Sequence, residues 1–339
     1  MEPSTSTDWD SVLQFVADPL DLDFSPKATE TAVLQTGGNL QVPTPPSSND
    51  GTPATEETTE GTTLVSISTT FYPGSQINEH TPDVVLLTSD SVFFYVHASI
   101  LLRSSTNQFN NLLPPNPAPS EGQDAMLSLP EHSTVLNVIL HVIYEISCAH
   151  YSPPFPTLAA AVNRLSTYGI TPKLAIVPGT PTYAILLSHA PIFPLDLYAL
   201  AASFDLYDLA VATSSHLLSF PLATLTDEMA ERIGPVYLKR LFFLHFGRSD
   251  ALKRVLLPPP HPHAPTPWCD FNEQKKLTRA WALASAYLAW DARPDLSTST
   301  MESALRPLAE HLTCDQCQLA LRDRIKNLVV QWSVVKRTI

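Results

Sequence analysis

Glycine is scarce in this chain. Only 10 of its 339 residues are glycine, a fraction of about 3%, whereas about 7% is usual in soluble proteins. The glycine-rich loops that hold phosphate groups and the glycine-flanked turn that presents a nucleophilic serine are both missing, because GxGxxG, GxxxxGK and GxSxG do not occur. The HExxH pair of zinc proteases is missing as well. We therefore predict that the protein is not an enzyme and needs no cofactor or small-molecule substrate.

Cysteines and long apolar runs are also few. Four cysteines in 339 residues do not make a disulfide framework. The opening MEPSTSTDWD lacks the basic start and the apolar stretch of a signal peptide. The longest weakly polar run, AWALASAYLAW at residues 280–290, is much shorter than the roughly 20 residues that span a bilayer. We expect a protein of the nucleus or cytoplasm with no membrane partner.

Positive charge is the third scarcity. Residues 1–62 hold eleven acidic residues and one basic residue, Lys27, whereas residues 63–339 hold 22 acidic and 19 basic residues. Because binding to phosphates relies on a basic surface, this balance predicts no direct contact with nucleic acid. Six basic residues are predicted to lie on one solvated helix face: Arg232, Lys239, Arg240, Arg248, Lys253 and Arg254.

The N-terminal segment, residues 1–68, is rich in Ser, Thr, Pro, Asp and Glu, as in TGGNLQVPTPPSSNDGTPATEETTEGTT. Such a composition buries too little apolar surface to offset the entropy of ordering, so we predict a disordered acidic tail. Six of its apolar side chains are interspersed with aspartates: Trp9, Leu13, Phe15, Leu20, Leu22 and Phe24. This mixture is shared with activation segments that fold onto a partner groove, and equally with tails that bind nothing.

Two short β-type runs follow the tail. Residues 83–87 (DVVLL) and 92–96 (VFFYV) are rich in β-branched and aromatic residues, and the turn-forming residues 88–91 separate them. We predict a hairpin, and a sheet covered on both faces because both runs are apolar throughout. A helix-like spacing starts after His97.

A third strand is predicted at residues 126–129, followed by an amphipathic helix over residues 135–144. The sequence thus predicts an α+β fold in which a small three-stranded sheet is flanked by helices. The order of elements, together with a spaced set of residues, resembles the BTB/POZ domain. The residues that carry this resemblance are Asp83, Phe94, His97, Leu101, Ser105 and Tyr144.

Three longer stretches, FYPGSQINEHTPDVVLLTSD, LYALAASFDLYDLA and YLKRLFFLHFGRSDALKRVLL, are similar to those of fungal BTB-containing proteins. The resemblance implies a non-enzymatic adaptor that binds protein partners, including a second copy of itself in a homodimer. It implies a role in transcription regulation or in bringing substrates to a ubiquitin ligase. In such a module the six residues define the fold and do not touch a substrate.

Two positions depart from the BTB pattern. Ala98 stands where the family usually has Lys or Arg, which helps to shape a partner groove in BTB repressors, so co-repressor binding by that route is not expected. Phe109 lies four residues after Ser105, where three is usual, and this extra residue indicates either a local bulge or a variation within a subfamily. His97 has no neighbouring Ser, Cys or Asp to make it a catalytic base, so we predict that it satisfies backbone groups at the strand-to-helix junction.

The rest of the chain is predicted to be helical. Helices are expected at residues 226–233, 235–246, 250–256, 273–291 and 301–335, the last interrupted near Thr313. The aromatic and leucine-rich run at 237–246 is predicted to be core. Our predicted domains are a tail at 1–68, a BTB-like domain at 69–175, a helical extension at 176–257, a Pro-rich linker at 258–270 and a C-terminal helical segment at 271–339.

One group of side chains suggests a metal. His311, Cys314 and Cys317, with Cys269, would offer one nitrogen and three sulfurs to a tetrahedral zinc ion, in a metal-dependent enzyme or a zinc-stabilised protein.

A second interpretation needs no metal, because Cys317 shares a helical spacing with Leu321, Ile325, Leu328 and Trp332 and fits a buried apolar stripe. Zinc sites usually combine two close ligand pairs, and the second pair would need Cys269 with His261 or His263 of the Pro-rich segment. The adaptor without metal is the function that the sequence favours.

Overall fold

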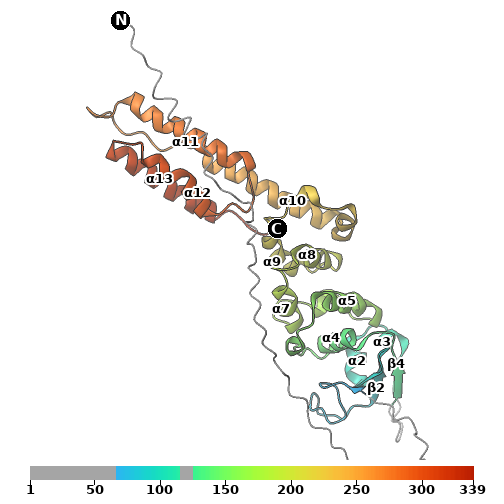
Figure 1. Ribbon diagram of the computed structural model, residues 1–339. Coiled ribbons are helices and arrows are strands. Elements are labelled where there is room, and N and C mark those ends of the chain that lie inside the picture. Colours follow the sequence, from blue (N-terminus) through green and yellow to red (C-terminus); the bar gives the residue numbers. More distant parts are fainter. Residues whose placement is uncertain (1–65, 115–124) are drawn as a thin grey trace, which may run out of the picture. The chain divides into compact units, whose positions relative to one another are not determined.

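The described part of the chain, residues 66–114 and 125–339 of a computed structural model, begins with a small mixed β-sheet (Figure 1). Its four strands are β1 (Ser66–Ile67), β2 (Val84–Leu87), β3 (Val92–Val96) and β4 (Ala125–Ser128). Their order is β1-β3-β2-β4: β2 and β3 form an antiparallel hairpin, and β1 and β4 join its two sides in parallel. The predicted tail residues from Trp9 to Phe24 lie outside the described residues.

The hairpin confirms the predicted strands to within one residue. Thr88 closes its turn, since the Thr88 backbone N–H donates to the Val92 carbonyl at 3.1 Å and Ser91 adopts a φ of 61°. The predicted count of three strands is wrong, because β1 adds a fourth. A strand of two residues is too short to show an alternation of apolar and polar residues, so the sequence pattern does not predict it.

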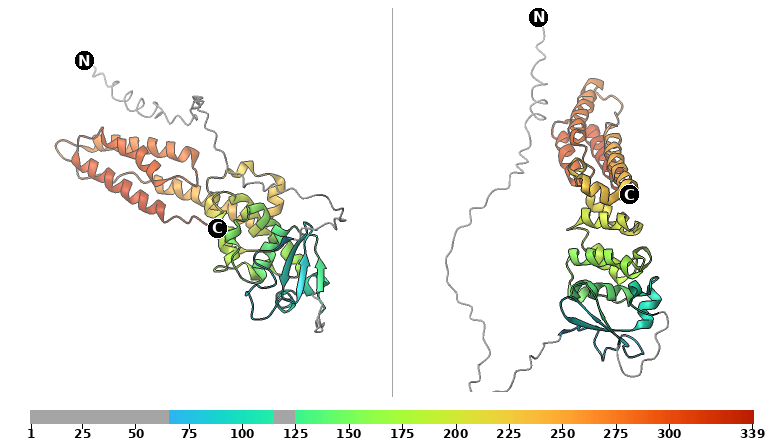
Figure 2. Two further views of the ribbon diagram at one scale, coloured as in Figure 1. Left: turned by 60° about the horizontal axis from the view of Figure 1, so that its bottom comes forward. Right: turned by 90° about the vertical axis from the view of Figure 1, so that its right-hand side faces the viewer.

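Helices cover this sheet in successive layers. They are α2 (Ala98–Ser104), α3 (Gln108–Asn111), α4 (Ser133–Ile143) and α5 (Phe155–Leu165). Phe71 joins the layers, because its ring lies 6.2 Å from that of Phe94 in β3 and 5.2 Å from both His141 in α4 and Tyr144. Figure 2 shows α4 next to the sheet and α5 beyond it. The coarse α+β prediction is confirmed.

Four short helices continue the layers: α6 (Pro172–Ala175), α7 (Pro181–Ser188), α8 (Pro194–Ser203) and α9 (Tyr207–Ser214). Three of them begin with proline, at Pro172, Pro181 and Pro194. Proline suits the first helical position because its missing N–H would have no helical partner there. Short 3₁₀-helices complete the connections between the described helices: η1 (Ala149–Tyr151), η2 (Ser166–Tyr168), η3 (Ser215–Leu217), η4 (Leu222–Thr224) and η5 (Arg306–Ala309).

The long helix α10 (Asp227–Leu256) contains a kink at Gly234, where φ is 74°. Only glycine adopts this backbone region without strain, and Pro235 then restarts the helix. The predicted break at this point is confirmed. The predicted second break before residue 250 is wrong, because the helix continues through Gly247 and buries Arg248 and Leu252 on its inner side.

The C-terminal helices are α11 (Phe271–Asp291), α12 (Thr298–Leu305) and α13 (Asp315–Ser333). The predicted helix at 273–291 and the predicted interruption near Thr313 are confirmed. One continuous apolar core runs from Phe71 to Leu241. The buried apolar side chains that follow it come from the end of α10 and the three C-terminal helices: Leu252, Leu256, Leu277, Trp281, Leu288, Met301, Leu305, Leu321, Ile325, Leu328 and Trp332.

Arg248 corrects one expectation about the basic cluster. It was predicted to lie on a solvated face, but only 4% of it is exposed. Its guanidinium donates to the carbonyls of Pro294, Val335 and Lys336 at 2.6 to 3.0 Å and lies over the ring of Trp332. Arg248 of α10 thereby bonds to the connection between α11 and α12 and to the residues that follow α13. Within the described residues, none of the helices has the length and hydrophobicity to cross a bilayer.

Candidate metal centre and the strand–helix junction

The junction between β3 and α2 contains three of the residues that resemble the BTB pattern. His97 is the N-cap residue of α2, but its side chain makes no capping hydrogen bond. Asp83 supplies that bond from the start of β2, because its Oδ1 accepts from the backbone N–H of Ala98 at 2.7 Å. The positive end of the helix dipole also stabilises a carboxylate at this place. Asp83, the residue directly before β2, therefore caps the N-terminus of α2.

Both ring nitrogens of His97 have partners. Nε2 lies 2.8 Å from the carbonyl oxygen of His80, and Nδ1 lies 2.9 Å from the hydroxyl of Tyr144. Because a carbonyl only accepts, Nε2 carries the proton and Nδ1 accepts from Tyr144. The Tyr144 hydroxyl in turn accepts from the His97 backbone N–H at 2.9 Å. Burial raises the pKa of Tyr144 to about 12, so this hydroxyl keeps its proton.

This closed set of bonds gives His97 a structural role. With 3% exposure, the imidazole satisfies buried groups around it, as expected from the sequence. Phe94 and Leu101 are buried in the core beside it. No free ring nitrogen remains on His97 to act as a catalytic base.

Ser105 holds the end of α2. Its hydroxyl donates to the carbonyl of Tyr168 at 2.7 Å and accepts from the N–H of Phe109 at 2.8 Å. The backbone is irregular where the extra residue predicted a bulge, since Gln108 through Asn111 all have positive φ, from 52° to 59°. Left-handed turns of this kind are disfavoured for residues other than glycine, although Asn tolerates them. The turn places the buried ring of Phe109 on that of Tyr168, with centroids 4.4 Å apart.

A second group of chemically active side chains gathers beside the C-terminal helices. His263, Cys269, Cys314 and Cys317 each offer one ligand atom, and these four atoms all lie within 4.8 Å of one another. The imidazole Nε2 of His263 is 3.2 Å from Cys317 Sγ and 3.4 Å from Cys314 Sγ. Cys269 Sγ is 3.6 Å from Cys317 Sγ. One nitrogen and three sulfurs are the donor set of a Cys₃His zinc site.

Two local structures bring the four side chains together. Thr266 and Cys269 form an isolated antiparallel bridge, with backbone N–H···O distances of 3.0 and 3.2 Å, so the chain makes a tight turn just before α11. Cys314 is the N-cap residue of α13 and Cys317 lies in its first turn. A CxxC pair at a helix start places both sulfurs on one side, because residues three apart share a helix face.

The three thiols have different environments. The backbone N–H of Cys317, followed by that of Gln316, lowers the pKa of Cys314 to about 7 at the positive end of α13. Burial raises the pKa of Cys317 to about 12 and raises that of Cys269. Cys269 and Cys317 are only 3% and 4% exposed. All four cysteines of the chain are free thiols in this structure.

The histidine of this cluster differs from the one in the predicted set. His311, three residues before Cys314, is not among the gathered ligands, and His263 takes that place. The sequence indicates His263 only as one of two weaker partners for Cys269. The prediction from the apolar stripe is confirmed at the same time, because Cys317, Leu321, Ile325, Leu328 and Trp332 are all buried on α13. A buried stripe and a ligand position are therefore compatible.

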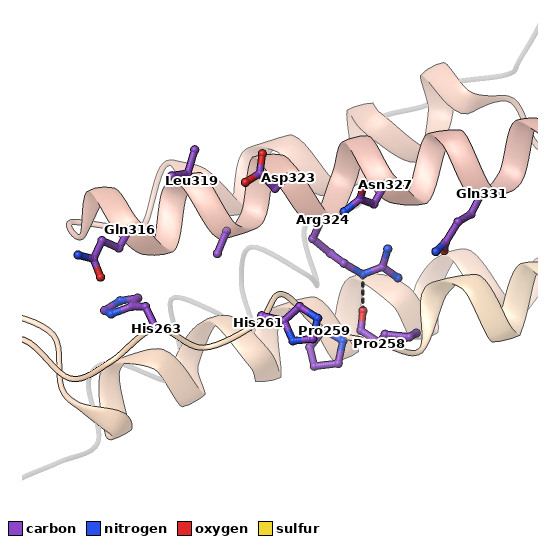
Figure 3. A pocket seen from close by; sticks show the side chains of 11 residues that line it. Pro258, Pro259, His261, His263, Gln316, Leu319, Asp323, Arg324, Asn327 and Gln331 are labelled. Carbon is purple, nitrogen blue, oxygen red and sulfur yellow. Dashed lines mark hydrogen bonds between the residues drawn. The ribbon is translucent and has the colours of Figure 1, made fainter.

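A cavity of about 630 Å³ lies beside the cluster, between the loop after α10 and helix α13 (Figure 3). His263 stands next to Gln316 at one end of it. Further along, Arg324 of α13 donates to the carbonyl of Pro258 at 2.7 Å and to that of Val255. This arginine, which the sequence did not single out, ties the loop to α13.

Comparison with known proteins gives no relative. No family model, no curated protein and no solved structure matches the chain.

Proposed function

We propose that the protein is a non-enzymatic adaptor that binds other proteins through a BTB-like module and its helical extension. Two features support the BTB-like part. The strands and helices follow one another in the order that the resemblance implies, and Asp83, His97 and Tyr144 close one buried junction. The engagement of both His97 nitrogens supports a scaffold role for that residue rather than a catalytic one.

The observation that carries the proposal is a row of exposed aromatic side chains on α10. Phe242, Phe243 and Phe246 are 47%, 63% and 72% exposed. The sequence had predicted this run to be core, and that is wrong for these three rings, while Leu241 and Leu244 beside them are buried. A helix that buries one face and shows phenylalanines on the other is suited to lie against a partner surface.

The adaptor hypothesis can be tested by proximity labelling in cells. The full chain is compared with a double variant, Phe243→Ser with Phe246→Ser. The matched control is Tyr287→Ser, which removes an aromatic ring that is 64% exposed on α11. We expect the double variant to lose a defined set of partners that the control retains, with unchanged circular dichroism. Identical partner lists for all three proteins would show that this surface binds no partner. A partner list of the full chain that does not exceed background would reject the adaptor function.

The identity of the lost partners separates two roles. Transcription factors or cullin-ligase components would support transcription regulation or ubiquitin-ligase recruitment respectively. The acidic segment with Trp9 and Phe15 favours the first role, through its composition alone.

Self-association is the second part of the proposal. Strand β4 is an outer strand of the sheet, and its Met126 is 60% exposed. An outer strand can add a strand from another chain. Light scattering of the full chain at micromolar concentration should give twice the monomer mass. A monomer mass would reject self-association and keep the adaptor proposal for a single chain.

A further inference from the structure

We propose that His263, Cys269, Cys314 and Cys317 bind one Zn²⁺ ion in a closed structural site that joins the loop between α10 and α11 to the start of α13. This inference is independent of the adaptor function, since it rests on a different part of the chain.

Three of the six distances between the ligand atoms are close to the edges of a tetrahedron around zinc, and all six are at most 4.8 Å. With Zn–S bonds of about 2.3 Å and a Zn–N bond of about 2.05 Å, the edges of the tetrahedron measure about 3.8 Å for S···S and about 3.6 Å for S···N. The S···S distance between Cys269 and Cys317 is 3.6 Å. The distances from His263 Nε2 to the sulfurs of Cys317 and Cys314 are 3.2 and 3.4 Å. These three edges are therefore within about 0.4 Å of the ideal values.

The orientation of His263 is a second, independent observation. Its Nδ1 lies 2.7 Å from the carbonyl oxygen of Ala264. A carbonyl only accepts, so Nδ1 carries the proton and the lone pair of Nε2 points at the sulfurs. Zinc-bound histidines almost always donate their other N–H in this way, which fixes the tautomer. Gln274 adds a further support, because its side-chain amide donates to the His263 carbonyl at 3.1 Å.

A disulfide, a calcium ion or a magnesium ion fits the cluster less well than zinc. A disulfide needs sulfurs about 2.05 Å apart, and Cys269 and Cys317 are 3.6 Å apart. Calcium and magnesium prefer oxygen ligands, whereas a Cys₃His set is one of the usual ligand sets of structural zinc. Four protein ligands leave no open position for water or substrate, so the chemistry of the site is structural and not catalytic.

The loop that carries His263 explains why a metal is useful here. Residues 258–267 include six prolines, and a proline has no backbone N–H with which to form hydrogen bonds. Few backbone donors are thus left to fasten the loop. Zinc would join this loop to α13 through Cys269 and Cys317, which are 48 positions apart in the sequence. The binding free energy of the metal then contributes to the stability of the C-terminal helices.

The test begins with the full chain, purified without a histidine tag and without chelators. Zinc is measured by plasma mass spectrometry and by its release after a thiol-blocking mercurial. We expect close to one zinc per chain. His263→Ala and Cys317→Ser should each reduce bound zinc to background. Three matched controls should retain it: His261→Ala in the same loop, His311→Ala beside the CxxC pair and Cys148→Ala, a buried thiol of the first core.

Several results would overturn the proposal. Wild-type protein with zinc at background level rejects the site, and so does bound zinc that survives both His263→Ala and Cys317→Ser. Loss in His311→Ala together with retention in His263→Ala rejects this ligand set in favour of the other histidine. If the ligand variants do not fold, reconstitution of the wild-type chain with Co²⁺ decides the matter. Strong thiolate-to-cobalt and tetrahedral d–d absorption supports the site, and a weak octahedral spectrum rejects it.

Discussion

Asp83 and Ala98 are joined by a hydrogen bond of 2.7 Å from the Ala98 backbone N–H to the Asp83 carboxylate. The bond connects the beginning of the hairpin to the first residue of α2, across 15 residues of sequence. The residue next to the helix, His97, uses its own side chain elsewhere. Asp83 thus caps the helix, while the His97 side chain bonds to Tyr144 and to the His80 carbonyl.

Replacing Asp83 should destabilise the fold. Asp83→Ala removes a helix cap and leaves the Ala98 N–H without its acceptor, which costs about 1–2 kcal/mol. Asp83→Asn keeps an oxygen acceptor and should cost less. Urea unfolding of both variants measures the difference, with Glu79→Ala at an exposed position as the control. Equal stability of Asp83→Ala and the control would contradict the capping role.

Asp90 predicts a dependence on acidic pH. Although burial acts in the opposite direction, hydrogen bonds from Ser133 and Thr88 lower its pKa to about 2 from 3.8. The carboxylate accepts from the Ser133 N–H at 2.8 Å and hydroxyl at 2.6 Å at the start of α4. A lowered carboxyl pKa gives stability that is present above about pH 4 and lost as pH falls towards 2. In Asp90→Ala this loss should be smaller, and an unchanged acid-unfolding curve would refute it.

Two buried histidines predict a loss of stability at a milder pH. Burial lowers the pKa of His141 and of His245 below 6.5. Because the unfolded chain then binds more protons than the folded chain, stability is complete above about pH 6.5 and decreases as the pH falls below it. Unfolding by urea at several pH values should show this decrease. Replacing both histidines with Gln should flatten the curve between neutral pH and about pH 5, and an equally steep curve would rule out their contribution.

Arg324 should be difficult to replace. It is 8% exposed, donates to the carbonyls of Pro258 and Val255, and lies over the ring of Trp281. Lysine cannot reproduce the planar fork, so Arg324→Lys should cost about 2 kcal/mol. Thermal unfolding measures the effect, and Arg322→Lys on the exposed side of α13 is the control. Matching melting temperatures for the two variants would mean that the loop is held in another way.

Removal of metal should act locally. If zinc fastens the loop to α13, a chelator should increase amide hydrogen exchange more in α11 and α13 than in β2 and β3. The reason is that the ligands belong to the C-terminal helices and the loop before them. Hydrogen exchange followed by mass spectrometry gives this resolution. Exchange that rises equally in the sheet would indicate general unfolding instead.

Much of the secondary structure was predictable because local patterns determine it. The turn formers at Thr88 and Ser91 sit between two β-branched runs, and Gly234 with Pro235 interrupts a helical spacing. The misjudged helix end near Gly247 has a tertiary cause, since buried Arg248 extends the packing of α10. The exposure of Phe243 could not be foreseen either, because spacing alone does not say which side of a helix meets the core.

Only part of the cluster of His263, Cys269, Cys314 and Cys317 could be predicted from the sequence. The CxxC pair of Cys314 and Cys317 is local and could be recognised. The choice of His263 over His311 depends on where a Pro-rich loop meets α13, which is a long-range contact without a periodic signal. The useful sequence signal was the pairing of His263 with Cys269 in one short segment.

Helix α10 contributes side chains to the core that begins at Phe71 and also to the buried groups of the C-terminal helices. Ile233, Tyr237 and Leu241 belong to the first, whereas Leu252 and Leu256 accompany the second. After Gly234 no loop interrupts the helix between these two sets. Unfolding the C-terminal helices alone would break backbone hydrogen bonds in the middle of α10, which also packs in the first core. We therefore expect heat to unfold the two sets of helices in a single cooperative transition.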